Sequence, residues 1–173
     1  MISIKKNFLS NLLHSFPVVI LFILVFTGFD LSFFIFGNNF SFNFISIVIF
    51  YWVLKKPNML GYGFIFFAGI INDVVQNFPI GISSINYLLL CAIAAFIRAR
   101  TILPNLLYDW LIFFVAILIV SSIDYSVLSI IFNFPIEYET LMFNSLITFL
   151  IYPIFSKIFD QINLLNLKGK DVK

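Results

Sequence analysis

The sequence predicts an all-α integral membrane protein with six transmembrane helices in one bundle, and three observations lead to that prediction. Of the 173 residues, 62% are hydrophobic and 10% are charged, whereas soluble domains have roughly 45 to 50% and about 25%. The mean hydropathy is +1.09, an apolar excess too large for one soluble core to bury. Apolar runs alternate with short polar loops along the whole chain, so no separate soluble domain is predicted.

A helix that crosses the hydrocarbon core needs about 20 apolar residues, and tilt or mismatch accommodates shorter and longer runs. On that basis the chain is a single polytopic membrane domain over residues 1–173. The predicted helices are 16–36, 42–54, 60–78, 83–97, 106–131 and 141–159. The first is interpreted as a retained helix rather than a signal peptide, because its apolar run is long and no small-residue cleavage site follows it.

The placement of basic residues supports this topology, since Lys and Arg collect in short loops on the cytoplasmic side. Every basic residue falls on one side of the six-helix arrangement: Lys5, Lys6, Lys55, Lys56, Arg98, Arg100, Lys157, Lys168, Lys170 and Lys173. The opposite loops, 37–40, 79–81 and 133–140, contain no Lys or Arg. Both termini are therefore predicted to be cytoplasmic.

No motif for catalysis or cofactor binding is found. The sequence contains no GxSxG, P-loop, CxxC or HExxH pattern, and its single cysteine, Cys91, permits no disulfide within the chain. The net charge of +2 is small, and the basic residues are scattered over four loops. We therefore expect no enzyme activity, no cofactor or metal and no nucleic-acid partner.

The third predicted helix carries the candidate functional residues Gly69, Asn72 and Asp73. A charge in hydrocarbon costs about 2.5 to 3.5 kcal/mol on insertion scales, so Asp73 needs an explanation. Gly69 and Asp73 share a helix face, and small residues let membrane helices approach closely. We expect this face to point into the bundle or at a protein partner. Two interpretations stay open, a proton, cation or substrate contact and a buried polar anchor, and the anchor is favoured because no basic residue lies deep in a span.

Two further groups of residues have predicted structural roles. Tyr51 and Trp52 before two lysines and Pro57 are typical of an anchor at the membrane interface, with aromatic rings at headgroup level. Pro79 and Gly81 suit a tight external turn, because Pro fixes φ and Gly tolerates left-handed conformations.

The last predicted helix contains Asn144, Tyr152 and Pro153. A proline inside a membrane helix frees a backbone carbonyl that a neighbouring group must satisfy. Asp124, in the outer half of the fifth helix, is expected to reach the outer interface.

Three stretches together resemble the MreD family of rod shape-determining proteins: YWVLKKP at 51–57, GYGFIFFAGIINDV at 61–74 and FPIG at 78–81. Ile80 replaces the leucine usual in the family's turn. The similarity continues through the arginines after the fourth helix, Asp124 in the fifth and the Asn144-to-Pro153 segment, so it covers nearly the whole chain.

The resemblance implies a non-catalytic component of the bacterial inner membrane that supports MreC and lateral peptidoglycan synthesis in the cell-elongation machinery. It also implies contact, through that complex, with the MreB filament and the wall polymerase and transpeptidase. The implied fold is similar to the substrate-binding components of energy-coupling-factor transporters. The alternative function is therefore a small-molecule-binding subunit of such a transporter, with an outward-facing cavity near Asp73, Asn86 and Tyr87.

Overall fold

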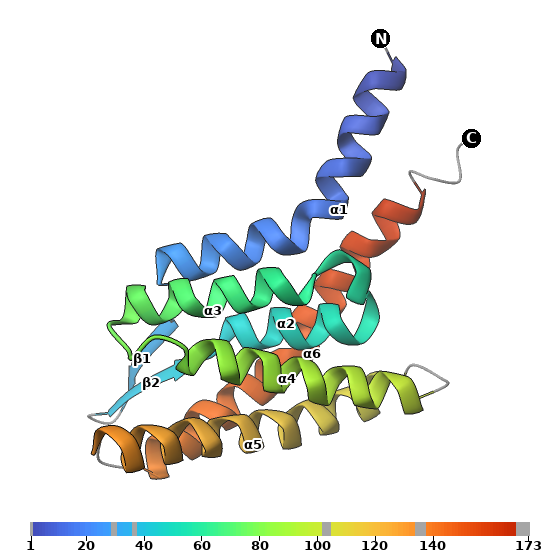
Figure 1. Cartoon of the computed structure of the whole chain (residues 1–173). Coiled ribbons are helices and arrows are strands. Elements are labelled where there is room, and N and C mark those ends of the chain that lie inside the picture. Colours follow the sequence, from blue (N-terminus) through green and yellow to red (C-terminus); the bar gives the residue numbers. More distant parts are fainter. Residues whose placement is uncertain (1, 29–30, 36–37, 102–104, 134–137, 169–173) are drawn as a thin grey trace.

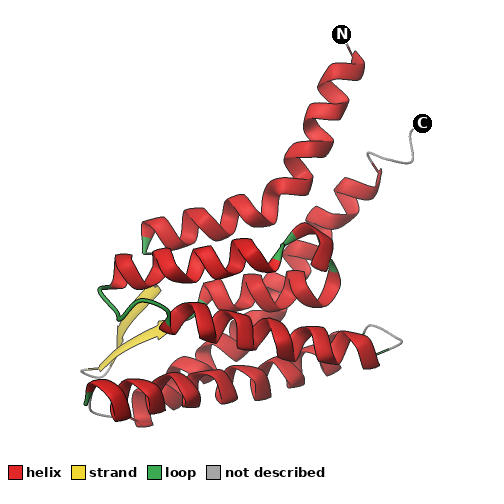
Figure 2. Cartoon of the chain, in the orientation of Figure 1, coloured by secondary structure: helices red, strands yellow, loops and turns green. Residues whose placement is uncertain are grey.

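Six helices and one β-hairpin make up the computed structural model, which describes residues 2–28, 31–35, 38–101, 105–133 and 138–168 (Figures 1 and 2). The elements are α1 Ile2–Thr27, β1 Leu31–Ile35, β2 Asn38–Phe42, α2 Phe44–Lys55, the 3-10 turn η1 Pro57–Met59, α3 Tyr62–Gln76, α4 Ile82–Arg100, α5 Leu106–Phe132 and α6 Tyr138–Lys168.

Helix α2 lies at the centre of the bundle. All ten residues from 45 to 54 are buried, and α2 packs against α1, α4 and α6. A helix that is apolar on every side needs burial on every side, and here other helices supply it. At 12 residues and about 1.5 Å per residue, α2 is too short to cross about 30 Å of hydrocarbon by itself.

The first helix differs from its prediction at both ends. It begins at Ile2 and ends at Thr27, and the apolar residues 31–35 that were assigned to it form strand β1, which pairs antiparallel with β2. The reason is Gly28, whose φ of +56° takes the chain out of the helix into a left-handed conformation that glycine adopts readily. A short apolar run rich in Phe and Ile suits a strand as well as a helix, and hydropathy alone does not separate the two.

The other five predicted helices are present, with shifted ends. The largest shift is in α6, which starts at Tyr138 and continues to Lys168 instead of ending at residue 159. Within the described residues, three stretches are long and apolar enough to cross a membrane: Ile82–Arg100, Leu106–Phe132 and Tyr138–Leu164. Three shorter apolar helices, Ser15–Thr27, Phe44–Lys55 and Tyr62–Gln76, pack with them.

The two ends of the bundle differ in charge. The start of α1, the end of α6, the α2–α3 connection and the end of α4 lie at one end of the bundle, and the hairpin and the α3–α4 turn lie at the other (Figure 1). Lys55, Lys56, Arg98 and Arg100 are at the first end. We call these the basic end and the hairpin end.

Candidate functional site

The candidate face of α3 lies directly against α4, and Gly69 is the point of closest approach. A Cβ atom at Gly69 would lie 2.6 Å from the backbone nitrogen of Ser84 and nearer still to its Cα. The Ser84 hydroxyl donates a 3.1 Å hydrogen bond to the carbonyl of Phe66, one turn earlier in α3. Only glycine leaves room for this backbone contact, so Gly69 sets the distance between the two helices.

Asp73 caps the N-terminus of α4 from the neighbouring helix. Its side chain is fully buried. The Gly81 N–H donates to Oδ2 at 2.6 Å and the Ser83 N–H donates to Oδ1 at 2.9 Å. The first N–H groups of a helix have no intrahelical acceptor, and a carboxylate there also meets the positive end of the helix dipole. These contacts explain how a carboxylate is buried here although no Lys or Arg that the structure describes pairs with it.

The α3–α4 turn directs these backbone groups at Asp73. Asn77 ends α3 in the left-handed conformation. Gly81, with φ of +108°, adopts a backbone that side chains rarely allow, and it lacks a side chain with which to cap α4 itself. Pro79 lies between them, as expected of a tight turn. Asn72 closes the arrangement, donating from Nδ2 to the Ser83 hydroxyl at 3.0 Å.

Gly69, Asn72 and Asp73 are thus all buried, and the contacts just described are with α4 and its turn. Both carboxylate oxygens of Asp73 accept hydrogen bonds from the backbone. This is the geometry of a buried polar anchor. The face of α3 that was expected to point into the bundle or at a protein partner is therefore covered by α4 of the same chain.

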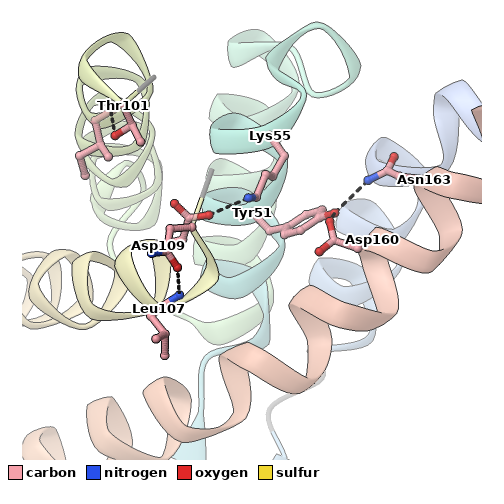
Figure 3. A network of polar contacts seen from close by, with 9 residues as sticks. Tyr51, Lys55, Thr101, Leu107, Asp109, Asp160 and Asn163 are labelled. Atoms are coloured by element: carbon pink, nitrogen blue, oxygen red, sulfur yellow. Dashed lines mark hydrogen bonds and ion pairs between the residues drawn. The ribbon is translucent and has the colours of Figure 1, made fainter. Parts of the chain in front are cut away.

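A second polar network ties α2 to α5 and α6 near the basic end (Figure 3). The Tyr51 hydroxyl donates to Asp160 Oδ1 at 2.6 Å and accepts from Asn163 Nδ2 at 2.9 Å. Lys55 Nζ lies 2.6 Å from Asp109 Oδ2. Sequence reasoning missed Asp109, Asp160 and Asn163; the available signal was that both carboxylates lie near helix ends on the side where the lysines collect.

The prediction that Tyr51 and Trp52 lie at the membrane interface is wrong. Both side chains are buried in the bundle, at 0% and 1% exposure, and both rings pack on Phe159, with centroids 5.1 and 6.0 Å away. The cause is the central position of α2, which takes these rings away from lipid headgroups. Pro57 opens η1 just after α2 ends.

The polar residues of α6 are also used inside the chain. Asn144 Oδ1 accepts from the Ser41 N–H at 2.9 Å, which joins α6 to strand β2. The Tyr152 ring stacks on Phe113 with centroids 4.4 Å apart. Pro153 lacks the N–H that would bond Phe149 four residues earlier, and Trp110 Nε1 donates to that carbonyl at 2.7 Å.

A cavity of about 410 Å³ opens at the hairpin end. Asn72, Ser83, Asn86 and Tyr87 line it and Asp73 does not. Asp124, expected at the outer interface, is half-buried in this wall, where Asn86 Nδ2 donates to its Oδ1 at 2.6 Å. Among the described residues there is no group of three or more His, Cys, Asp or Glu that could hold a metal ion.

A family model described as rod shape-determining protein MreD matches residues 9–162 of the chain. The matched segment runs from α1 into α6 and includes the Asp73 anchor, the cavity and all of the Tyr51 network except Asn163. No curated protein and no solved structure matches the chain. The expected likeness to the substrate-binding components of energy-coupling-factor transporters stays a prediction.

Proposed function

Because this chain belongs to the MreD family of rod shape-determining proteins, we propose that it is a non-catalytic membrane scaffold of the cell-elongation machinery. In this proposal it holds the membrane helix of MreC and so supports lateral peptidoglycan synthesis. The MreB filament and the wall polymerase and transpeptidase connect to it through that complex. The family relationship supports the role in rod shape, and a surface groove on α5 supports the contact with a partner helix.

The proposed setting is the bacterial inner membrane, with the six-helix bundle spanning it and both termini in the cytoplasm. The charge difference between the basic end and the hairpin end supports this orientation, because Lys and Arg mark the cytoplasmic side. Glu139, exposed in the first turn of α6, lies at the hairpin end. The short helix α2 needs no lipid contact, since its neighbours bury it.

The proposed contact for MreC is a groove on the outer half of α5. Its volume is about 280 Å³, and its lining is Ser122, Ile123, Ser126, Val127, Ile130 and Ile131. Ser122 and Ser126 are exposed and four residues apart, so they share one face of α5. Ser126 donates its hydroxyl to the Ser122 carbonyl at 2.7 Å, which satisfies the polar group in lipid.

Small residues flanked by β-branched side chains form the kind of surface on which transmembrane helices pack, because their backbones approach closely there. All six lining residues of the groove belong to α5, and the exposed Ser122 and Ser126 leave room there for a partner. The Gly69 face offers no such room, because α4 already fills it. This contrast between an open α5 groove and a filled α3 face carries the proposal.

Affinity purification from detergent-solubilised native membranes tests the proposal. A double substitution, Ser122→Leu with Ser126→Leu, fills the groove and should reduce recovery of MreC at least about tenfold if packing there supplies more than about 1.4 kcal/mol. Val115→Leu is the matched control, because Val115 is exposed on the same helix but lies outside the groove. Recovery of MreC unchanged by the double substitution would refute this surface.

The alternative is a substrate-binding subunit of an energy-coupling-factor type transporter, and the polar cavity at the hairpin end is the observation that favours it. The same purification separates the two functions. A scaffold should bring down MreC, whereas a transporter subunit should bring down an ATPase module and a second membrane subunit.

A further inference from the structure

The cavity at the hairpin end exists because the central helix starts late. Its floor includes Asn43, Ile45 and Ser46, the cap and first turn of α2, while α5 and α6 continue past this level to form its walls (Figure 1). Its volume of about 410 Å³ falls in the range of small-molecule sites, roughly 300 to 1,000 Å³. The cavity is partly open, so a solute has access to it.

Hydrogen bonds between elements hold the polar wall in place. Asn43 N–H donates to the Thr148 hydroxyl at 3.0 Å, and that hydroxyl donates to the Asn144 carbonyl at 2.7 Å. Asn144 in turn accepts from Ser41 of β2. Most lining side chains carry a hydroxyl or an amide. A wall of preorganised polar groups suits a ligand with several hydrogen-bonding groups of its own.

The charge of the lining residues indicates that the ligand is positively charged. Among the lining residues that the structure describes, Asp124 is the only charged one, and none is Lys, Arg or His. Asn86 engages its Oδ1 atom. A carboxylate in a half-buried site is costly unless a cation or further hydrogen bonds compensate it. Phe78, Tyr87 and Tyr125 also line the cavity, and aromatic faces attract cations.

We propose that this cavity binds a small amine that also carries hydroxyl or amide groups, with its ammonium group against Asp124. The site is distinct from the proposed MreC groove. On α5, Ser121, Asp124 and Leu128 line the cavity, whereas Ser122 and Ser126 line the groove on another face of the helix. The inference therefore does not depend on the scaffold role.

Thermal unfolding of the purified full-length protein in detergent tests the proposal with three amines: glucosamine, ethanolamine and putrescine. A ligand that binds only the native state raises the midpoint of unfolding, and above Kd the rise follows the logarithm of the ligand concentration. Glucosamine, which has both an amine and hydroxyls, should give the largest rise. N-acetylglucosamine at equal concentration is the control for general stabilisation by sugars, because acetylation removes the charge. It should give no such logarithmic rise.

Two variants locate the binding. Asp124→Asn keeps an oxygen for Asn86 but removes the charge, and it should weaken glucosamine binding at least about tenfold. Glu139→Gln removes a carboxylate that lies outside the cavity and should leave binding unchanged. If Asp124→Asn does not fold, Ser121→Phe fills the cavity and should abolish the shift. The proposal would be overturned if none of the three amines raised the midpoint more than N-acetylglucosamine does, or if the shift were equal in wild type and Asp124→Asn.

Discussion

The indole N–H of Trp110 donates a 2.7 Å hydrogen bond to the backbone carbonyl of Phe149, which is the acceptor that Pro153 leaves without its helical donor. The two rings also stack, with centroids 4.6 Å apart. An unpaired carbonyl in a dry bundle is expensive, so a proline inside α6 is tolerable only with such a partner. The contact joins α5 to α6 at the point where Pro153 removes a hydrogen bond from α6.

This contact predicts a measurable coupling between Trp110 and Pro153. Trp110→Phe keeps the stacking but leaves the Phe149 carbonyl unpaired, and it should lower the free energy of unfolding by about 1 to 3 kcal/mol. In a Pro153→Ala background the new N–H can bond that carbonyl, so the same substitution should cost much less. A double-mutant cycle followed by thermal unfolding in detergent measures the difference, and equal costs in the two backgrounds would contradict the assignment.

Replacing Gly69 with alanine should lower the stability of the protein, whereas replacing Gly63 with alanine should not. Gly69→Ala places Cβ inside the backbone of Ser84 and should destabilise the α3–α4 pair by about 1 to 3 kcal/mol. Gly63→Ala adds Cβ where nothing lies within 4 Å, and its better helix propensity should leave the stability unchanged or raise it by up to about 1 kcal/mol. Unfolding midpoints of the two variants, measured side by side, check the prediction; a Gly69→Ala protein as stable as wild type would refute the close approach.

Substitutions of Asp73 should cost more stability when the new side chain keeps fewer hydrogen-bond acceptors. Asp73→Ala removes both acceptors from the α4 N-terminus and should cost about 2 kcal/mol, the upper part of the range for helix caps. Asp73→Asn keeps one oxygen and should cost less. A proton or cation relay would instead make Asn as damaging as Ala in a functional assay while leaving stability unchanged. Comparing unfolding with complementation of cell shape for both variants separates these roles.

Substitutions of Lys55 and Lys56 should differ in their effect on stability, although both residues are at the basic end. Lys55 pairs with Asp109, whose side chain is 5% exposed, so Lys55→Met leaves a buried carboxylate without its cation at a cost of about 3 kcal/mol. Lys56→Met is the control and should change stability by less than about 0.5 kcal/mol. Adding Asp109→Asn to Lys55→Met should recover part of the loss. Equal effects at 55 and 56 would show that the ion pair adds nothing.

Maleimide labelling in intact cells checks the orientation. Cys91 is 1% exposed and should not react with a membrane-impermeant maleimide, so the wild-type chain gives a low background. Glu139→Cys at the hairpin end should be labelled from outside, and Lys56→Cys at the basic end should react only after the cells are opened. Labelling of Lys56→Cys in intact cells would reverse the proposed topology.

Hydropathy and charge were enough to predict the protein class, five of the helices and the end at which the basic residues lie. These are properties of composition along the chain, and lipid treats Leu, Ile and Phe nearly alike, so exact packing does not enter. The candidate residues of α3 were found the same way, because a carboxylate and small residues stand out in an apolar run. The assignment of residues 31–35 to a helix was wrong, since an apolar run of that length is compatible with a strand that has a partner nearby.

Hydropathy and charge patterns did not predict which polar groups pair with each other. Tyr51 meets Asp160 and Asn86 meets Asp124 across many intervening residues, and each meeting depends on how far one helix is rotated and shifted against another. Contacts such as that of Gly69 with Ser84 set those rotations, and they follow from the shapes of both surfaces together. Composition placed this chain in a membrane, whereas the burial of Tyr51 and Trp52, the capping of α4 by Asp73 and the cavity above α2 arose only when the helices packed.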